Sequence, residues 1–313
     1  MNIAISGSLA YDFIMDFPDE FKNHIMPDSL HILNVCFMID KLNKSWGGTA
    51  GNIAYTMKLL EQEPLMLSAL GKDASEYMAH FEKNNLSTKY IIKDKDQFTS
   101  SAHITTDKAD NQLTAFYNGP LERSLEQNIK DIEEKVNLVI VSPTQKEVMI
   151  KHLKEAHELG LETVFDPGQQ ITAFSEIELK KMIGQADFLT GNDYEIKLIS
   201  KKTGWSLEEI LKYVKVLVIT LGGRGSIIRA GDETVEVGIC SPQSVDDPTG
   251  AGDAYRAGFF SGYVSGYDFK KCGQMGSVAS SYAIENYGTQ AHGFTKTDFE
   301  ERYKKAFNEE IKF

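Results

Sequence analysis

The chain has 313 residues, of which 42% are hydrophobic and 25% are charged, as in soluble globular proteins with a large core. Its formal net charge of -12 and pI near 5.1 argue against unspecific nucleic-acid or anionic-membrane binding, because a phosphate surface would be repelled. There is no basic signal-peptide start and no apolar run near the ~18 residues of a membrane span, so we expect a cytoplasmic protein with no nucleic-acid or membrane partner. The three cysteines, Cys36, Cys240 and Cys272, lack metal-ligand spacing, and we expect buried free thiols.

Strand-like apolar runs alternate with helix-period segments along most of the chain. The apolar runs predict buried strands at 3–6, 64–70, 138–141, 163–165, 188–190 and 216–221. The helical period predicts helices over 50–60, 74–84, 146–159, 177–183 and 193–201. This alternation is typical of an α/β fold with a mainly parallel sheet that helices cover on both faces.

Two stretches, 35–46 and 90–117, contain no long helix pattern. Thr, Ser, Ile, Phe and Tyr mix there with turn residues, which predicts antiparallel strands of a smaller sheet. The sequence has no linker-like or repetitive segment, so we expect one domain over 1–313 with this sheet inserted at about 13–46 and 90–117. Ligands of open α/β sheets bind at the carboxyl ends of the strands, and the candidate site residues follow those strands.

The strongest motif is Asp247-Pro-Thr-Gly-Ala-Gly-Asp253, which runs into a predicted helix over 254–262. A glycine-rich helix start offers unpaired backbone N–H groups to phosphate oxygens, and Gly250 and Gly252 remove side chains that would block the approach. Asp253 would then lie where it could accept the proton of an acceptor hydroxyl. The alternative is that the glycines form a turn and Asp253 only favours the helix start.

Two further motifs follow predicted strands. Asn192-x-x-Glu195 opens a helix, and its side chains could face phosphates or form an N-terminal capping box; both roles can coexist. Thr220-Leu-Gly-Gly-Arg-Gly225 could let a nucleotide approach the backbone or could form a hairpin turn between 216–221 and short strands at 226–229 and 234–237. Asp12 follows the first strand, where a carboxylate could accept hydrogen bonds from the two hydroxyls of a ribose.

These motifs resemble the ribokinase/PfkB family of carbohydrate kinases. Its C-terminal signature resembles 247–253 with the following Ala-Tyr-Arg-Ala-Gly-Phe, and its N-terminal Gly-Gly signature resembles 47–52. The stretches 7–12, 166–170, 192–195 and 220–225 also occur in family order. Within the family, the chain is most similar to bacterial-type adenosine kinases, through 17–18, the stretch before Gly47, 169–170 and 288–290.

The resemblance implies a ribokinase-like, doubly wound α/β fold with a small β-sheet lid. It also implies an ATP-dependent kinase that transfers the γ-phosphate to the 5′-hydroxyl of a nucleoside, with adenosine giving AMP as the first expectation. The implied catalytic residues are Asp253 as the base and Gly250, Ala251 and Gly252 as the anion hole. The implied ATP-site residues are Asn192, Thr220, Gly222 and Gly225, and Glu195 would act on Mg²⁺ through water. The implied acceptor-site residues are Asp12, Ser8, Gly48, Asn52, Gln169, Gln170 and a stacking aromatic, Phe116 or Phe37.

Several alternatives stay open at this point. The acceptor could be a free sugar, as for a ribokinase or a fructokinase, or it could be inosine or guanosine. A non-catalytic nucleoside-binding protein is an alternative of another class, against which the retained Asp253, Gly252 and Glu195 argue. Related adenosine kinases place an aromatic residue where this chain has Ala102. Stacking on the nucleobase would then be weaker or come from another residue, so the preferred nucleoside stays open. A requirement for a monovalent cation such as K⁺ and a homodimer formed through the lid are also open.

Overall fold

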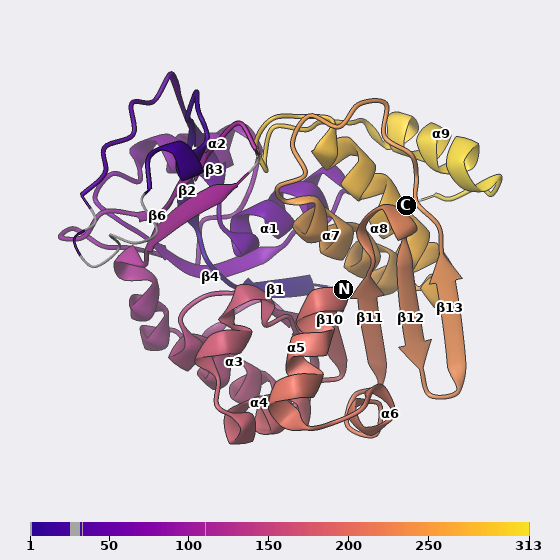
Figure 1. The fold of residues 1–313 in the computed structure, drawn as a ribbon. Coiled ribbons are helices and arrows are strands. Elements are labelled where there is room, and N and C mark those ends of the chain that lie inside the picture. The colour runs from indigo at the N-terminus through magenta and orange to yellow at the C-terminus, as the bar shows by residue number, and fades with distance from the viewer. Residues whose placement is uncertain (1, 26–31, 33, 110, 313) are drawn as a thin grey trace.

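Two β-sheets organise the chain in a computed structural model that describes residues 2–25, 32, 34–109 and 111–312 (Figure 1). In these ranges the larger sheet has the strand order β13-β12-β11-β10-β9-β8-β1-β4-β5. The strands from β11 to β5 in this order are parallel, and β12 and β13 continue the sheet as an antiparallel hairpin. The strands of the large sheet are β1 (Asn2–Ser6), β4 (Leu65–Leu70), β5 (Ile91–Lys93), β8 (Val136–Val141), β9 (Glu162–Phe165), β10 (Phe188–Asn192), β11 (Val216–Thr220), β12 (Ser226–Ala230) and β13 (Glu233–Val237).

Helices cover both faces of this sheet (Figure 1). Alternate side chains of β1 enter different cores: Ile3 and Ile5 lie in one hydrophobic cluster and Ala4 lies in the other, as the alternation of a strand requires. One face carries α1 (Thr49–Leu59), α2 (Ser75–Lys83), α7 (Ala251–Val264) and α8 (Phe269–Ile284), with α9 (Lys296–Phe307) packed on α8; the other carries α3 (Lys146–Glu158), α4 (Glu176–Ile183), α5 (Asp193–Thr203) and α6 (Leu207–Ile210). Short 3₁₀ helices lie at Phe21–Asn23, Gly119–Glu126, Ile129–Asp131, Gly168–Ala173 and Gly222–Arg224.

The chain reverses its direction of sheet growth at β1. Strands β4 and β5 are added on one side of β1, and β8 to β11 are added on the other. This is the topological switch point at which doubly wound sheets bind ligands. The loops after β1 and β8 meet there, because Ser8 N donates a hydrogen bond to Pro143 O at 3.1 Å. The predicted doubly wound fold is confirmed.

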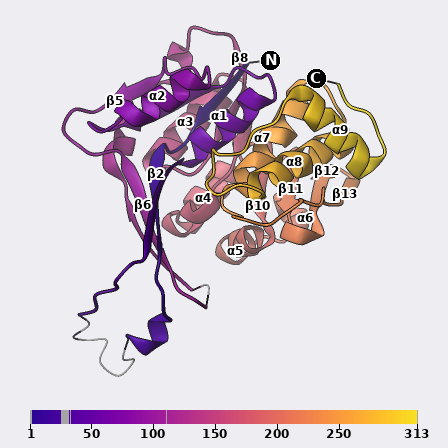
Figure 2. The same ribbon diagram turned by 90° about the horizontal axis from the view of Figure 1, so that it is seen from above.

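The smaller sheet projects from one side of the large one (Figure 2). It has the order β3-β2-β6-β7, from β2 (Ala10–Asp16), β3 (Lys41–Gly47), β6 (Ser100–Thr106) and β7 (Gln112–Tyr117). We call it the small sheet. The predicted all-antiparallel pairing is wrong for its central pair, since β2 and β6 run parallel. Part of the predicted insertion, 26–31, 33 and 110, lies outside the described residues.

Two other predictions differ from the structure. The stretch 90–117 was expected to belong wholly to the small sheet, but β5 pairs in parallel with β4 at the edge of the large sheet. Cys36 was expected to be buried and is exposed, whereas Cys240 and Cys272 are buried, and all three thiols are free. None of the helices in the described ranges combines the length and apolar character that a membrane crossing requires.

Candidate active site

The start of α7 presents free backbone donors at the carboxyl edge of the large sheet. Gly250 is the N-cap residue, with φ of 80° in the left-handed region, and a Cβ there would lie 2.9 Å from the Thr289 side chain. The N–H of Ala251 donates to Pro248 O. Among the described residues, the N–H groups of Gly252 and Asp253 have no backbone acceptor in the loop before the helix. Free amides at a helix start are suited to binding phosphate oxygens.

Asp253 is held by a buried hydrogen-bond chain. Its Oδ2 accepts a hydrogen bond from Asn52 Nδ2 at 2.8 Å. Asn52 Oδ1 in turn accepts from Thr289 Oγ1 at 2.8 Å and from Gln290 Nε2 at 3.0 Å. These two donors fix the Asn52 amide so that its nitrogen faces Asp253. Burial raises the pKa of Asp253, while Arg256 and the Asn52 hydrogen bond act against that rise.

A cavity of about 200 Å³ opens beside Asp253. Its lining includes three carboxylates, Asp166, Glu195 and Asp253, and one cation, Arg256. The structure thus brings together seven of the predicted site residues, from segments that are far apart in the sequence. These lining residues are Gln169, Asn192, Glu195, Thr220, Gly250, Gly252 and Asp253.

A second cavity of about 420 Å³ adjoins the first and shares Thr220 and Gly252 with it. Three predicted nucleotide-site residues line it, namely Thr220, Gly222 and Gly225, together with Ala251. Most of its wall is apolar, which is the usual character of a pocket for a flat heterocycle. Sequence reasoning missed this wall, whose residues include Ile239, Cys240, Pro242, Val245, Tyr255 and Ile284.

Asn192 and Glu195 form the capping box that was one of their two predicted roles. Asn192 Oδ1 accepts from Glu195 N at 2.8 Å, and Glu195 Oε2 accepts from Asn192 N at 2.8 Å. Both residues also line the smaller cavity, so the second role is geometrically compatible with the first. In the described ranges no cluster of three or more His, Cys, Asp or Glu side chains is arranged to hold a metal ion.

Asp12 brings a further carboxylate to the same region from the small sheet. The residue is only 8% exposed. Burial, together with the charges of Asp253 and Asp247, raises the pKa of Asp12 to about 7. Its carboxyl group occupies the space beside Gly47, where a Cβ would lie 2.1 Å from Asp12 Oδ2. The glycine at 47 is therefore required by the placement of Asp12.

Asp12 belongs to a row of residues that crosses the small sheet. It pairs with Ser45 on β3 and with Ala102 on β6, and Ala102 pairs with Phe116 on β7. Directly paired residues point to the same face of a sheet, so Asp12, Ala102 and Phe116 share one face. Phe116 is 49% exposed. Phe37 instead packs its ring among other aromatic residues of the chain segment between β2 and β3.

The other predicted acceptor-site residues have different positions. The Ser8 hydroxyl accepts from Thr49 N at 3.1 Å and so contacts the start of α1. Gly48 has φ of 87°, and a Cβ there would lie 2.5 Å from Ser8 O. Asn52 touches Asp253 as described. Gln169 lines the smaller cavity, whereas Gln170 is not among the lining residues of either cavity.

A doubly wound α/β sheet with free amides at a helix start and an adjacent carboxylate is the architecture of a ribokinase-like phosphotransferase. The chain belongs to the pfkB family of carbohydrate kinases, whose family model matches residues 34–296. It is similar to a nucleoside kinase from Methanocaldococcus jannaschii, with 32% identity over 274 residues that cover 87% of this chain and 90% of the relative. The enzyme is a phosphotransferase with an alcohol group as acceptor, and its family is ATP-dependent.

Two solved structures of the Burkholderia thailandensis nucleoside kinase are also similar. The complex with inosine has a TM-score of 0.91 and 35% identity, and the match covers 99% of this chain and 100% of that one. The complex with ADP and inosine has a TM-score of 0.89 and 36% identity, with coverage of 99% and 97%. The fold and the family resemblance inferred from the motifs are thereby confirmed.

Proposed function

We propose that this protein transfers the γ-phosphate of ATP to the 5′-hydroxyl of a purine nucleoside, with adenosine as the first acceptor to test. The observation that carries the proposal is a pair of carboxylates, Asp253 at the start of α7 and Asp12 on strand β2 of the small sheet. Asp12 does not line either cavity, but Thr289 links the end of β3 beside Asp12 to Asn52, which contacts Asp253. Asp253 lies at the anion-binding helix start, and Asp12 on the small sheet is close enough for Asp253 to raise its pKa. A ribose has a diol for one carboxylate and a primary hydroxyl for the other.

In this proposal Asp253 accepts the proton of the 5′-hydroxyl as that oxygen attacks the γ-phosphorus. The bond from the γ-phosphorus to the bridging oxygen breaks, and ADP leaves. Asn52 keeps the Asp253 carboxylate in place, and the free amides at 252 and 253 stabilise the charge of the transferring group. Alignment and charge stabilisation supply most of the catalysis in phosphoryl transfer.

The nucleotide would extend from the smaller cavity into the larger, more apolar one. Asn192 and Thr220 would face its phosphates, and Gly222 and Gly225 would lie beside its ribose and base. The donor set suits Mg²⁺, because Glu195 uses only Oε2 in the capping box and its other oxygen can bind a magnesium-bound water. Mg²⁺ is commonly held in this way, by phosphates and few carboxylates. The ion would neutralise phosphate charge.

The small sheet is proposed as the lid of the site, closing over the acceptor and excluding water that would otherwise hydrolyse ATP. On the same face as Asp12, Ala102 carries only a small side chain, and the exposed ring of Phe116 is the proposed stacking partner of the base. Inosine or guanosine is the second candidate acceptor, and the inosine complexes of the similar Burkholderia kinase favour it. The relatives thus support a nucleoside as the acceptor, and the acceptor panel described below decides among the purine nucleosides.

A homodimer through this lid stays part of the proposal. The exposed side chains of the small sheet include the large apolar residues Leu42, Leu113 and Tyr117. Such surfaces of strands associate unless they are covered. Size-exclusion chromatography with light scattering would show a mass of twice 35.0 kDa for the dimer, and the monomer mass at high protein concentration would contradict it.

The test of the function is an acceptor panel with one donor. ADP release from ATP would be measured with adenosine, inosine, guanosine, free ribose and fructose, and the product would be identified by ³¹P NMR. We expect a nucleoside 5′-monophosphate and a higher kcat/KM for nucleosides than for either sugar. The matched control is 5′-deoxyadenosine, which should inhibit competitively without being phosphorylated. A preference for ribose or fructose, or a product phosphorylated elsewhere, would overturn the proposal.

A further inference from the structure

We propose that Arg256 is a catalytic residue that binds the transferring phosphoryl group through its Nη1 nitrogen, while Asp166 holds the guanidinium in position. The inference rests on the proposed function, because it concerns the same phosphoryl transfer. Arg256 and Asp166 both occur in motifs of the sequence, but neither was assigned a role there. The structure joins them at the smaller cavity, beside Asp253.

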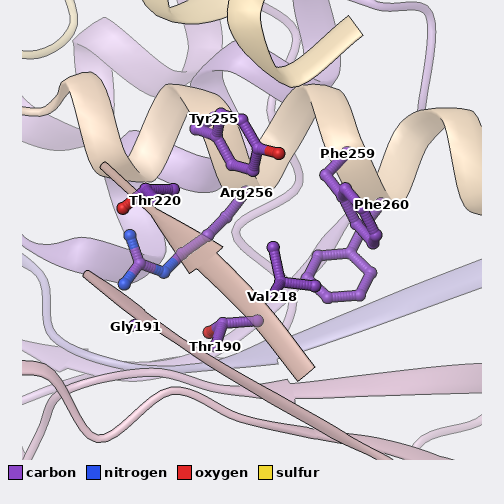
Figure 3. Close-up of a pocket in the computed structure, with 8 residues that line it drawn as sticks. All are labelled: Thr190, Gly191, Val218, Thr220, Tyr255, Arg256, Phe259 and Phe260. Atoms are coloured by element: carbon purple, nitrogen blue, oxygen red, sulfur yellow. The ribbon is translucent and has the colours of Figure 1, made fainter. Parts of the chain in front are cut away.

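Helical geometry places Arg256 at the anion-binding end of α7. It lies four residues after Gly252 and three after Asp253, so the three residues share one helix face. Long helical side chains point back toward the N-terminus of their helix, which in α7 is the anion-binding end. Figure 3 shows Arg256 extending from the helix toward Gly191 and Thr220, away from the rings of Phe259 and Phe260.

Asp166 occupies two of the three guanidinium nitrogens. Asp166 Oδ1 accepts from Arg256 Nη2 at 2.8 Å, and Oδ2 forms a close ion pair with Nε. The side chain of Asp166 is 1% exposed and that of Arg256 is 12% exposed. Within the described chain Nε is buried and makes no hydrogen bond, so one hydrogen bond at Nη2 and the charge of the adjacent carboxylate hold the guanidinium. These two contacts with Asp166 restrict the direction in which the remaining nitrogen points.

That remaining nitrogen, Nη1, lies against the anion-binding loop. A Cβ on Gly252 would be 2.8 Å from Arg256 Nη1, so the missing side chain at 252 gives the guanidinium its place. In the part of the chain that the structure describes, no hydrogen-bond or ion-pair partner is recorded for Nη1. A fixed, charged donor is thus left for a ligand at the loop that would hold the γ-phosphate.

The charge balance of the cavity favours such a donor. Three carboxylates and one cation line the cavity, and a triphosphate entering it would meet a net negative wall. Burial opposes the charge on Arg256, but the carboxylates of Asp166, Asp253 and Glu195 outweigh it and raise the pKa of the guanidinium. Arg256 therefore remains a cation throughout the working pH range.

The test combines substitution with chemical rescue. Arg256→Ala should lower kcat by about 10²–10³-fold, the scale of one lost donor to a developing charge, while the affinity for ADP changes by less than about threefold, a difference below about 0.7 kcal/mol. Millimolar guanidinium chloride should restore kcat at least in part, a response that a purely structural role would not give. The matched control is Arg302→Ala, because Arg302 forms a similar pair with Glu285 at 2.8 and 3.1 Å, with side chains 15% and 12% exposed, and neither residue lines the smaller cavity. Arg302 also donates to Ser281 in the wall of the larger cavity, so the ADP affinity of this variant is measured together with its kcat.

Loss of Arg256 leaves Asp166 buried without its cation, which could unfold the chain. The double variant Asp166→Asn with Arg256→Gln removes both charges and keeps a polar pair, and it should show the same loss of kcat with ADP affinity retained. The inference would be overturned if the folded variants kept a kcat near that of the wild type. It would also be overturned if guanidinium did not restore the lost kcat and the ADP affinity fell together with kcat. A wild-type enzyme that phosphorylates no nucleoside would instead refute the proposed function, so the two failures are distinguishable.

Discussion

Replacing Asp12 by asparagine should stabilise the protein at neutral and alkaline pH. Burial and two neighbouring acids raise the pKa of Asp12 from 3.8 to about 7, whereas the unfolded chain ionises near 3.8. A tenfold change in proton affinity corresponds to about 1.4 kcal/mol, so ionising Asp12 in the folded protein costs about 4 kcal/mol. With an unfolding entropy of about 2.1 cal/mol/K per residue, that cost corresponds to about 6 °C in Tm for a chain of this length.

The sign of the pH dependence follows from the direction of this shift. Below about pH 4 Asp12 is protonated in both states, and the wild type bears no cost. Between about pH 4 and pH 7 the unfolded chain gives up the proton first, so the stability contributed by protonated Asp12 is lost as pH rises. Asp12→Asn should therefore match the wild type near pH 4 and exceed its Tm at pH 8.

Thermal unfolding followed by circular dichroism at several pH values would measure this difference. Asp94→Asn is the control with the opposite sign, because the backbone N–H groups of Gln97 and Asp96 lower the pKa of Asp94. That variant should be less stable than the wild type at pH 8, and its deficit should vanish in acid. A Tm difference for Asp12→Asn that is the same at pH 4 and pH 8, or that is negative at pH 8, would refute the reasoning.

Three further predictions concern the site. Asn52→Asp places a second carboxylate beside Asp253, which should raise the pKa of Asp253 and move the acid limb of the kcat/KM profile against pH to higher pH. An acid limb at the wild-type pH would contradict the contact between residues 52 and 253. Phe116→Ala should raise the KM for adenosine about tenfold, the effect of about 1.4 kcal/mol of lost stacking, and a KM for ATP that rises equally would contradict stacking on the acceptor. Gly48→Ala should destabilise the fold by about 2 kcal/mol or more, because φ is 87° and backbone atoms lie within 2.7 Å of the added Cβ. The control in denaturant titrations is Gly238→Ala, whose added Cβ has no neighbour within 4 Å. Equal unfolding midpoints for the two variants would refute the prediction.

The parts of the fold that follow from local pattern could be predicted from the sequence. The buried strands of the large sheet appear as continuous apolar runs, since parallel strands are covered on both faces, and β8 and β11 were located in this way. The helix-start site at 250–253 was also predictable, because its glycines and acid are adjacent in the chain. The spacing of Asn192 and Glu195 predicted both an N-terminal capping box and a contact with phosphates, and the structure shows the capping box.

Features that depend on tertiary placement were not predictable in this way. The parallel pairing of β2 with β6 joins segments about ninety residues apart, and neither strand pattern specifies the direction of its partner. The three-residue strand β5 is too short to produce a period. The apolar wall at Ile239, Val245 and Ile284 comes from irregular segments and one helix end, and only folding assembles it. The pairing of Arg256 with Asp166 joins two motifs that had been read separately.

The central claim is that Asp253 is the base of a nucleoside kinase. The most direct measurement is single-turnover transfer from γ-labelled ATP to adenosine or inosine, comparing the wild type with Asp253→Asn under saturation with both ligands. The account predicts a rate lower by about 10²–10⁴-fold, the usual scale for a lost general base, with binding of ADP and of the nucleoside retained. Transfer at a near-normal rate in the variant would contradict it.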